Sequence, residues 1–200
     1  MQLTKVVEWV DIEAPCEDVY ALINDLQKRL QLSPLWGVTR IEDISDDFPE
    51  KGGHYRAEIV TGEQPAYETV ITENIPERKL AYKLSNPRET QVTWLIGDTA
   101  RGTRVTYEEE FLLLDGDGDE FIESVRKVIQ NWLKNIKRYS ELRGSRKKRL
   151  AKWLVDRYYL KLRPDQRRTV QMILFMHAIG FISFTMAAIA FGFARLVTGF

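Results

Sequence analysis

The sequence predicts an α+β protein in which a curved antiparallel sheet is wrapped on a long C-terminal helix, followed by a basic amphipathic segment and one transmembrane helix. Three observations predict this arrangement. Short stretches rich in β-branched and aromatic residues alternate with turns up to residue 114, an amphipathic stretch follows over 120–142, and residues 169–194 contain no Asp, Glu, Lys or Arg. We therefore divide the chain into a folded domain at 1–142, a basic juxtamembrane segment at 143–168 and a transmembrane helix at 169–197.

The sheet is predicted from seven strand segments. The first alternates polar and apolar residues and ends at Ala14-Pro15, after which Val19, Leu22 and Leu26 recur at the spacing of a short helical region. The later segments are separated by short turns containing Gly, Pro, Asn or Asp, which is typical of an antiparallel meander. The predicted strands are Lys5–Ile12, Val38–Ile44, His54–Val60, Ala66–Glu73, Lys79–Leu84, Gln91–Gly97 and Thr103–Leu114.

The long helix is predicted over Glu120–Leu142, where the apolar residues recur every three or four positions and form one stripe. A sheet with one apolar face needs a cover, and this helix has the matching stripe. We therefore expect the sheet to grip this helix. The stripe consists of Phe121, Val125, Ile129, Trp132, Leu133, Ile136 and Tyr139.

Charge is distributed unevenly along the chain. Residues 1–142 carry 27 acidic and 17 basic side chains, whereas residues 143–168 carry 2 acidic and 11 basic ones. The uncharged run that follows would form a helix about 39 Å long, enough to span a bilayer core of about 30 Å with some tilt. Because only Arg195 follows the run, the positive-inside rule predicts a single-pass membrane protein with its N-terminal domain in the cytoplasm. The single cysteine, Cys16, excludes an intramolecular disulfide, as expected for a reducing compartment.

Two short motifs and their order carry a resemblance to a known family. Ile12-Glu13-Ala14-Pro15 joins the first strand to a helix containing Val19-Tyr20, and Gly102-Thr103-Arg104-Val105-Thr106-Tyr107 enters the last strand. Together with the closing helix, they make residues 3–142 resemble the START-like, polyketide cyclase/dehydrase (SRPBCC) superfamily. The resemblance implies a helix-grip fold with an internal cavity, in which family members bind lipids, isoprenoids or other apolar molecules and some act as cyclases or hydrolases. The basic segment and the transmembrane helix lie outside the family pattern.

Alternation along the strands predicts which side chains face the long helix. Aromatic residues with a polar tip suit a mostly apolar pocket with a few hydrogen-bonding points, although the same residues could fill a solid core. Glu109 shares the phase of Tyr107, so its side chain could point inward, where it would have a raised pKa or a partner such as Arg56 or His54. The alternative is that Glu109 belongs to an exposed acidic face of the strand, and this is the favoured interpretation. The predicted ligand-binding residues are Tyr55, Tyr67, Tyr82, Trp94, Tyr107, Glu109 and Trp132.

The sequence indicates neither a catalytic set nor a metal site. The two histidines, His54 and His177, are far apart in the predicted topology, and no Ser or Cys nucleophile has a recognisable base and orienting acid. The acidic run starting at Asp115 fails as a calcium loop because its sixth and twelfth positions hold Glu120 and Arg126 instead of Gly and Glu. We expect a turn there with Asp119 as the helix N-cap, no metal, no cofactor, and a protein that leans away from enzymatic activity.

The basic segment favours a membrane surface over nucleic acid because it directly precedes the predicted span. Small residues in the span, such as Gly180, Ser183 and Ala187, would permit a homodimer through the transmembrane helix. The predicted membrane-interface residues are Arg146, Lys147, Lys148, Arg149, Trp153 and Tyr158.

The function predicted from these features is membrane-anchored binding, or transfer, of a hydrophobic ligand such as a lipid or isoprenoid in an internal cavity. One alternative is a cyclase/dehydrase-type enzyme acting on a polyketide-like substrate, with Glu109, Arg56 and Tyr107 as its polar candidates. The other is a ligand-free module that recruits a partner to the membrane.

Overall fold

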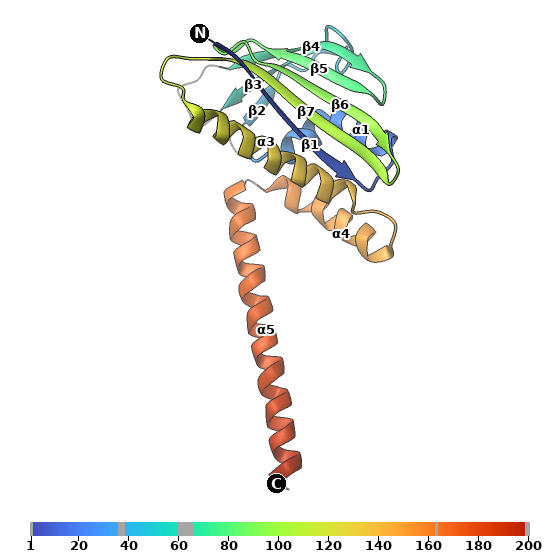
Figure 1. Cartoon of the computed structure of the whole chain (residues 1–200). Helices are drawn as coiled ribbons and strands as arrows, with labels where there is room; N and C mark the ends of the chain where they lie inside the picture. The colour runs from blue at the N-terminus through green and yellow to red at the C-terminus, as the bar shows by residue number, and fades with distance from the viewer. Residues whose placement is uncertain (1, 36–38, 60–65, 163, 199–200) are drawn as a thin grey trace. The chain divides into compact units, whose positions relative to one another are not determined.

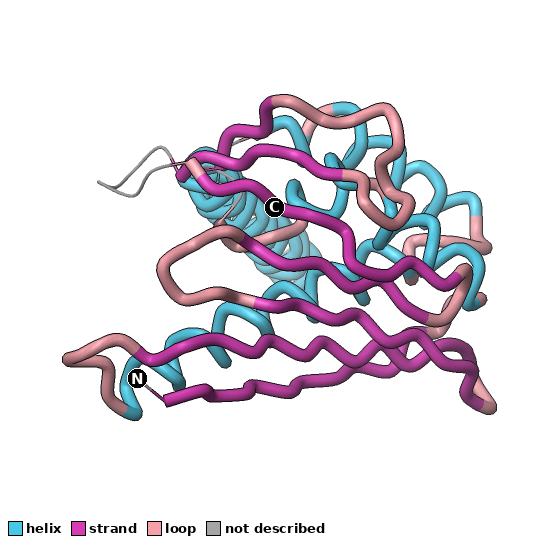
Figure 2. The backbone as a smooth tube through the Cα atoms, turned by 90° about the horizontal axis from the view of Figure 1, so that it is seen from above, coloured by secondary structure: helices cyan, strands magenta, loops and turns pink. Residues whose placement is uncertain are grey.

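The seven predicted strands form one antiparallel sheet in the computed structural model, which describes residues 2–35, 39–59, 66–162 and 164–198. The order across the sheet is β1-β7-β6-β5-β4-β3-β2, so consecutive strands are neighbours except where β1 pairs with the last strand (Figure 2). This confirms the predicted meander. The strands are β1 (Gln2–Ile12), β2 (Thr39–Glu42), β3 (His54–Ile59), β4 (Tyr67–Ile75), β5 (Lys79–Leu84), β6 (Gln91–Thr99) and β7 (Gly102–Leu113).

The strand ends differ from the predicted ones for local reasons. Strand β2 ends at Glu42 rather than Ile44, where Asp43 adopts a positive φ of 49° that an extended strand does not allow. Strand β4 continues to Ile75 through an irregularity between Ile71 and Glu73, where its register with β5 shifts. Val38 and Val60, two predicted strand ends, lie outside the described residues.

Helix α3 covers one face of the sheet, as predicted from its apolar stripe (Figure 1). Five residues of that stripe, from Ile129 to Tyr139, are buried, and they join a single core with the inward side chains of β1, β5, β6 and β7. The first of the two short helices between β1 and β2 adds to this core through Val19 and Ile23. The helices are α1 (Cys16–Asn24), α2 (Leu26–Gln31) and α3 (Asp119–Ser140).

The start of α3 corrects one prediction. Gly118, not Asp119, occupies the N-cap position, and it makes no side-chain cap. The turn before the helix is instead held by Asp117, which accepts a hydrogen bond from the Leu114 backbone N–H at 2.7 Å and forms an ion pair with Arg88. The acidic run therefore serves as a turn, with Asp117 as its organising residue.

The segment after α3 folds partly with the domain. The compact unit that contains the sheet extends to Lys161 and includes α4 (Arg146–Arg157) and a short 3-10 helix, η2 (Tyr159–Lys161). The Tyr139 hydroxyl donates a hydrogen bond to Asp156 Oδ1 at 2.6 Å, and Leu160 is buried in the core. Helix α4 thus packs against α3 by one of its faces.

The second unit, from Leu162 to the C-terminus, contains α5 (Pro164–Thr198). Within the described residues, one segment is long and apolar enough to cross a membrane: Thr169–Phe191, with a mean hydropathy of 2.0. None of that segment is buried against other parts of the chain.

The two motifs that carried the family resemblance are in contact with each other. Gly102 has a φ of +146°, and a Cβ atom there would lie 2.2 Å from the carbonyl oxygen of Ile12. Next to it, the Thr103 hydroxyl donates a buried hydrogen bond of 2.7 Å to the carbonyl oxygen of Ala14. The turn after β1 therefore fits against the start of β7 only because residue 102 has no side chain.

Replacing Gly102 by Ala should lower the free energy of unfolding by about 3 kcal/mol, because the added carbon meets a backbone oxygen and the φ angle is strained for any L side chain. Chemical denaturation of the full chain in mild detergent, followed by tryptophan fluorescence, measures the change. Gly97→Ala on the neighbouring strand is the matched control, because its added carbon meets open space. Equal stability of the two variants would contradict the steric argument.

Candidate functional site

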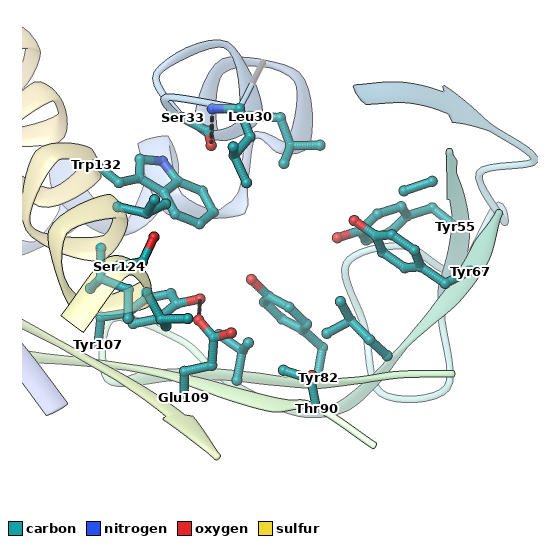
Figure 3. Close-up of a pocket in the computed structure, with 17 residues that line it drawn as sticks. Leu30, Ser33, Tyr55, Tyr67, Tyr82, Thr90, Tyr107, Glu109, Ser124 and Trp132 are labelled. Carbon is teal, nitrogen blue, oxygen red and sulfur yellow. Dashed lines mark hydrogen bonds between the residues drawn. The ribbon is translucent and has the colours of Figure 1, made fainter. Parts of the chain in front are cut away.

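A cavity of about 250 Å³ lies between the concave face of the sheet and the N-terminal half of α3 (Figure 3). Leu30 and Ser33, from α2 and the loop after it, close one side. Ser124 and Val128 of α3 close another, and inward side chains of β3 to β7 form the remaining wall. The cavity exists because the residues of α3 that face the sheet here are small, whereas those further along the helix fill the core.

Strand register determines which side chains meet in this wall. Val92 on β6 lies directly opposite both Tyr82 on β5 and Glu109 on β7, so these three residues form one row across the sheet. On the other side of β5, Tyr67 lies opposite Ala57. Since side chains alternate between faces along a strand, each member of these rows points toward α3.

Six of the seven residues predicted to bind a ligand line this cavity: Tyr55, Tyr67, Tyr82, Tyr107, Glu109 and Trp132. Trp94, the seventh, is fully buried and does not reach the cavity. It packs edge to face against Tyr107 and Trp132, with ring centroids 4.6 and 5.1 Å away. Trp94 therefore supports the wall from behind and holds two lining rings in place.

Glu109 points into the cavity, so the favoured prediction of an exposed acidic face was wrong at this position. The Tyr107 hydroxyl donates a hydrogen bond of 2.8 Å to Glu109 Oε2. Burial raises the pKa of Glu109, and the hydrogen bond from Tyr107 opposes this rise only in part. The carboxyl group is therefore harder to ionise than an exposed glutamate.

Arg56 and His54 do not partner Glu109, contrary to the suggestion from sequence. Both are exposed and lie beside Asp43 and Glu68 in a shallow depression on the outer face of the sheet. They flank Tyr55 along β3, so the same alternation that turns Tyr55 inward turns them outward.

Three tyrosines of the cavity, Tyr67, Tyr82 and Tyr107, are neutral phenols at physiological pH. Burial raises the pKa of Tyr67 to about 12, and it raises those of Tyr82 and Tyr107 further. The Trp94 indole Nε1–H donates a long hydrogen bond of 3.4 Å to the Tyr82 hydroxyl oxygen, which leaves the Tyr82 proton uncommitted. The wall is thus apolar carbon with a small group of hydroxyls.

Arg29 is a residue of this region that sequence reasoning missed. It is completely buried, and its guanidinium carbon lies 5.2 Å from the ring centroid of Tyr82. Its Nη1 donates a 2.7 Å hydrogen bond to the carbonyl oxygen of Ile23 near the C-terminal end of α1. Nothing in the sequence separates it from the exposed Lys28 beside it, because α2 has only six residues and no clear apolar stripe.

The site offers no metal centre. In the parts of the chain that the structure describes, no three His, Cys, Asp or Glu side chains come together as potential ligands. His54 is exposed on the sheet, and the His177 ring nitrogen Nδ1 lies 2.8 Å from the Ile173 carbonyl oxygen within α5.

Comparison with solved structures finds the same fold in proteins of low sequence identity. A protein from Chromobacterium violaceum is 18% identical, with a TM-score of 0.54 over 69% of this chain and 98% of its own. Ara h 8.0201 is 16% identical, with a TM-score of 0.55 over 70% of this chain and 98% of its own. The di-domain ARO/CYC protein StfQ of the steffimycin biosynthetic pathway is 13% identical, with a TM-score of 0.56 over 70% of this chain and 51% of its own.

At these identities the likeness shows the fold alone. No curated protein sequence matches the chain significantly. Residues 4–141, however, match the family described as polyketide cyclase / dehydrase and lipid transport, a match that spans both contacting motifs, the sheet and α3. The chain therefore belongs to the polyketide cyclase/dehydrase and lipid transport family.

Proposed function

We propose that this protein binds a hydrophobic small molecule, such as a lipid or an isoprenoid, in the cavity between the sheet and α3. The observation that carries the proposal is the wall itself, which is built of apolar side chains with a few hydrogen-bonding groups. Such a lining is typical of sites for apolar ligands that carry one polar group. The surroundings of Glu109 are consistent with the proposal, because burial among apolar side chains is the main cause that raises its pKa.

The size of the cavity restricts the ligand. Its volume of about 250 Å³ lies just below the range of about 300–1,000 Å³ that is usual for sites of drug-sized ligands. That space suits a single short chain or a small ring system. A ligand with two acyl chains would need the wall to move apart, so we propose a single-chain or compact molecule.

We further propose that the protein works at a membrane, held by α5 with the domain in the cytoplasm. The apolar segment Thr169–Phe191 and the excess of basic residues before it support this placement. Helix α4 adds a surface that suits lipid headgroups, because Leu150, Trp153 and Leu154 are exposed next to the basic run that begins at Arg146. Tyr158, also exposed, packs its ring against Trp153 at 6.0 Å.

A cyclase/dehydrase-type activity is the second candidate, and one observation favours it. Glu109 and Tyr107 form a hydrogen-bonded acid pair inside the cavity, and a carboxyl group with a raised pKa can exchange a proton with a bound substrate. A recruitment module without a ligand is the third, and the open space beside α3 counts against it.

Filling the cavity should abolish ligand binding. The full chain purified in mild detergent should yield a bound hydrophobic molecule by native mass spectrometry or solvent extraction, and Val128→Phe should reduce the yield about tenfold or more because the ring occupies the cavity. Val7→Phe makes the same change on an exposed strand face and is the control. An empty wild-type protein would refute the proposal, and a bound molecule whose mass differs between wild type and Glu109→Gln would favour the cyclase alternative.

Trp153 should lie at headgroup depth when the full chain is reconstituted in vesicles. Brominated lipids should then quench wild-type fluorescence more than that of Trp153→Phe, and the difference should grow with anionic lipid content. Trp9→Phe, which removes an exposed tryptophan of β1, is the control. If Trp153→Phe leaves the quenching unchanged, α4 does not contact the bilayer.

Protease added to vesicles whose cytoplasmic face is outward should digest residues 1–161.

Glu109 should make stability depend on pH. The pKa of Glu109 in the folded protein lies above its unfolded value of about 4.3. Its favourable contribution to the free energy of unfolding is therefore complete below about pH 4.3, and it is lost as the pH rises through the folded pKa. Glu109→Gln should therefore gain stability relative to wild type as pH rises from 4 to 8, measured by chemical denaturation. Glu110→Gln, one residue along on the outer face, is the control, and the same pH trend in both variants would contradict the assignment.

A further inference from the structure

Three of the polar groups of the cavity are donors that have no acceptor on the protein. Tyr55, Tyr67 and Tyr82 come from three neighbouring strands, and their hydroxyl groups point into the cavity (Figure 3). Within the described residues, none of the three hydroxyls donates a hydrogen bond to a protein group, and only Tyr82 takes part in one, as an acceptor from Trp94. Each hydroxyl therefore keeps a donor that an acceptor on a ligand can use.

Behind this cluster lies a buried positive charge without a counter-charge. Of the three guanidinium nitrogens of Arg29, Nη1 is bonded to Ile23, whereas Nε and Nη2 are buried and have no hydrogen-bond partner in the described structure. No carboxylate in the described ranges forms an ion pair with it. The ring of Tyr82 separates the guanidinium from the cavity, so Arg29 acts on the contents of the cavity through its field rather than by contact.

The acidic group of the cavity forms no ion pair with this charge. Glu109 is bonded to Tyr107 rather than to Arg29. Burial raises the pKa of Glu109, so its carboxyl group is harder to ionise than an exposed one. The tyrosine donors and the unpaired charge of Arg29 together suit a negatively charged group that only accepts hydrogen bonds.

We propose that the cavity takes a single-chain ligand that ends in a carboxylate, with the carboxylate accepting hydrogen bonds from Tyr55, Tyr67 and Tyr82. A carboxylate has two oxygens and about four acceptor positions, and no donor of its own, which matches three hydroxyls that lack acceptors. The tail of the ligand lies against Leu30 and Val128. Arg29 favours the anion over an uncharged analogue of the same length. This inference rests on the proposed ligand-binding function and names the chemical class of the ligand.

The test compares three ten-carbon probes that differ only in their end group: decanoate, decanol and methyl decanoate. Titration calorimetry with the full chain in lipid nanodiscs, corrected with empty nanodiscs, gives their affinities. Decanoate should bind about tenfold more tightly than either uncharged probe. Tyr82→Phe should lower the affinity for decanoate about tenfold and leave that for methyl decanoate within about twofold, because it removes a donor and keeps the ring.

Tyr20→Phe is the matched control, because its hydroxyl is bonded to Asn74 outside the cavity and its loss should not change the ratio of the affinities. Arg29→Gln should lower the preference for decanoate while the tyrosines remain. Equal affinities of wild type for the three probes would overturn the inference and leave the cavity function intact. If the wild-type protein binds none of the three probes, the inference of a carboxylate ligand is also overturned. Solvent extraction of a bound molecule then decides separately whether the cavity binds a hydrophobic ligand.

Discussion

The structure depends on the position of Trp132, which divides the space between the sheet and α3. Its indole Nε1–H donates a buried hydrogen bond of 2.9 Å to the carbonyl oxygen of Arg29, so α3 is tied to α2. Its ring packs against Trp94 and Tyr107, which ties α3 to β6 and β7. On the C-terminal side of Trp132 the stripe of α3 fills a solid core, and on the N-terminal side small residues leave the cavity. One residue therefore belongs both to the core and to the wall of the site.

Much of the fold follows from two sequence periods. Alternation in the strands and the stripe of the last domain helix predicted the order of elements, the covered face and six of the cavity residues. The orientation of Glu109 was misjudged because the sequence does not determine the strand register, and a slip of one residue would expose Glu109 and bury Glu108 or Glu110. The hydrogen bond from Tyr107 makes the buried position of Glu109 tolerable, and no sequence pattern reports that bond. The burial of Arg29 depends on contacts with Ile23 of the preceding helix and with Tyr82 of β5, and the second of these is distant in the chain.

The basic segment shows another limit of sequence reasoning. Its amphipathic pattern indicated one membrane-facing helix, but the pattern cannot tell a face that meets lipid from a face that meets the domain. In the structure α4 has one face against the domain and one exposed face. Asp156 is bonded to Tyr139 of α3, while Leu150, Trp153 and Leu154 remain exposed. Through these contacts the proposed lipid-facing surface is fixed relative to α3, and thus relative to the wall of the cavity.

Buried polar groups without partners carry an energetic cost in this fold. Each such group costs about 1–3 kcal/mol, and a domain is stable by only about 5–15 kcal/mol in total. Nε and Nη2 of Arg29, which have no hydrogen-bond partner in the described structure, are therefore a substantial cost to the folded state. The proposed ligand, whose carboxylate accepts hydrogen bonds from the tyrosine hydroxyls in the field of Arg29, binds only the folded state and stabilises it in proportion to the logarithm of its concentration above Kd. The buried charge that weakens the fold thus contributes to the free energy by which the proposed ligand is recognised.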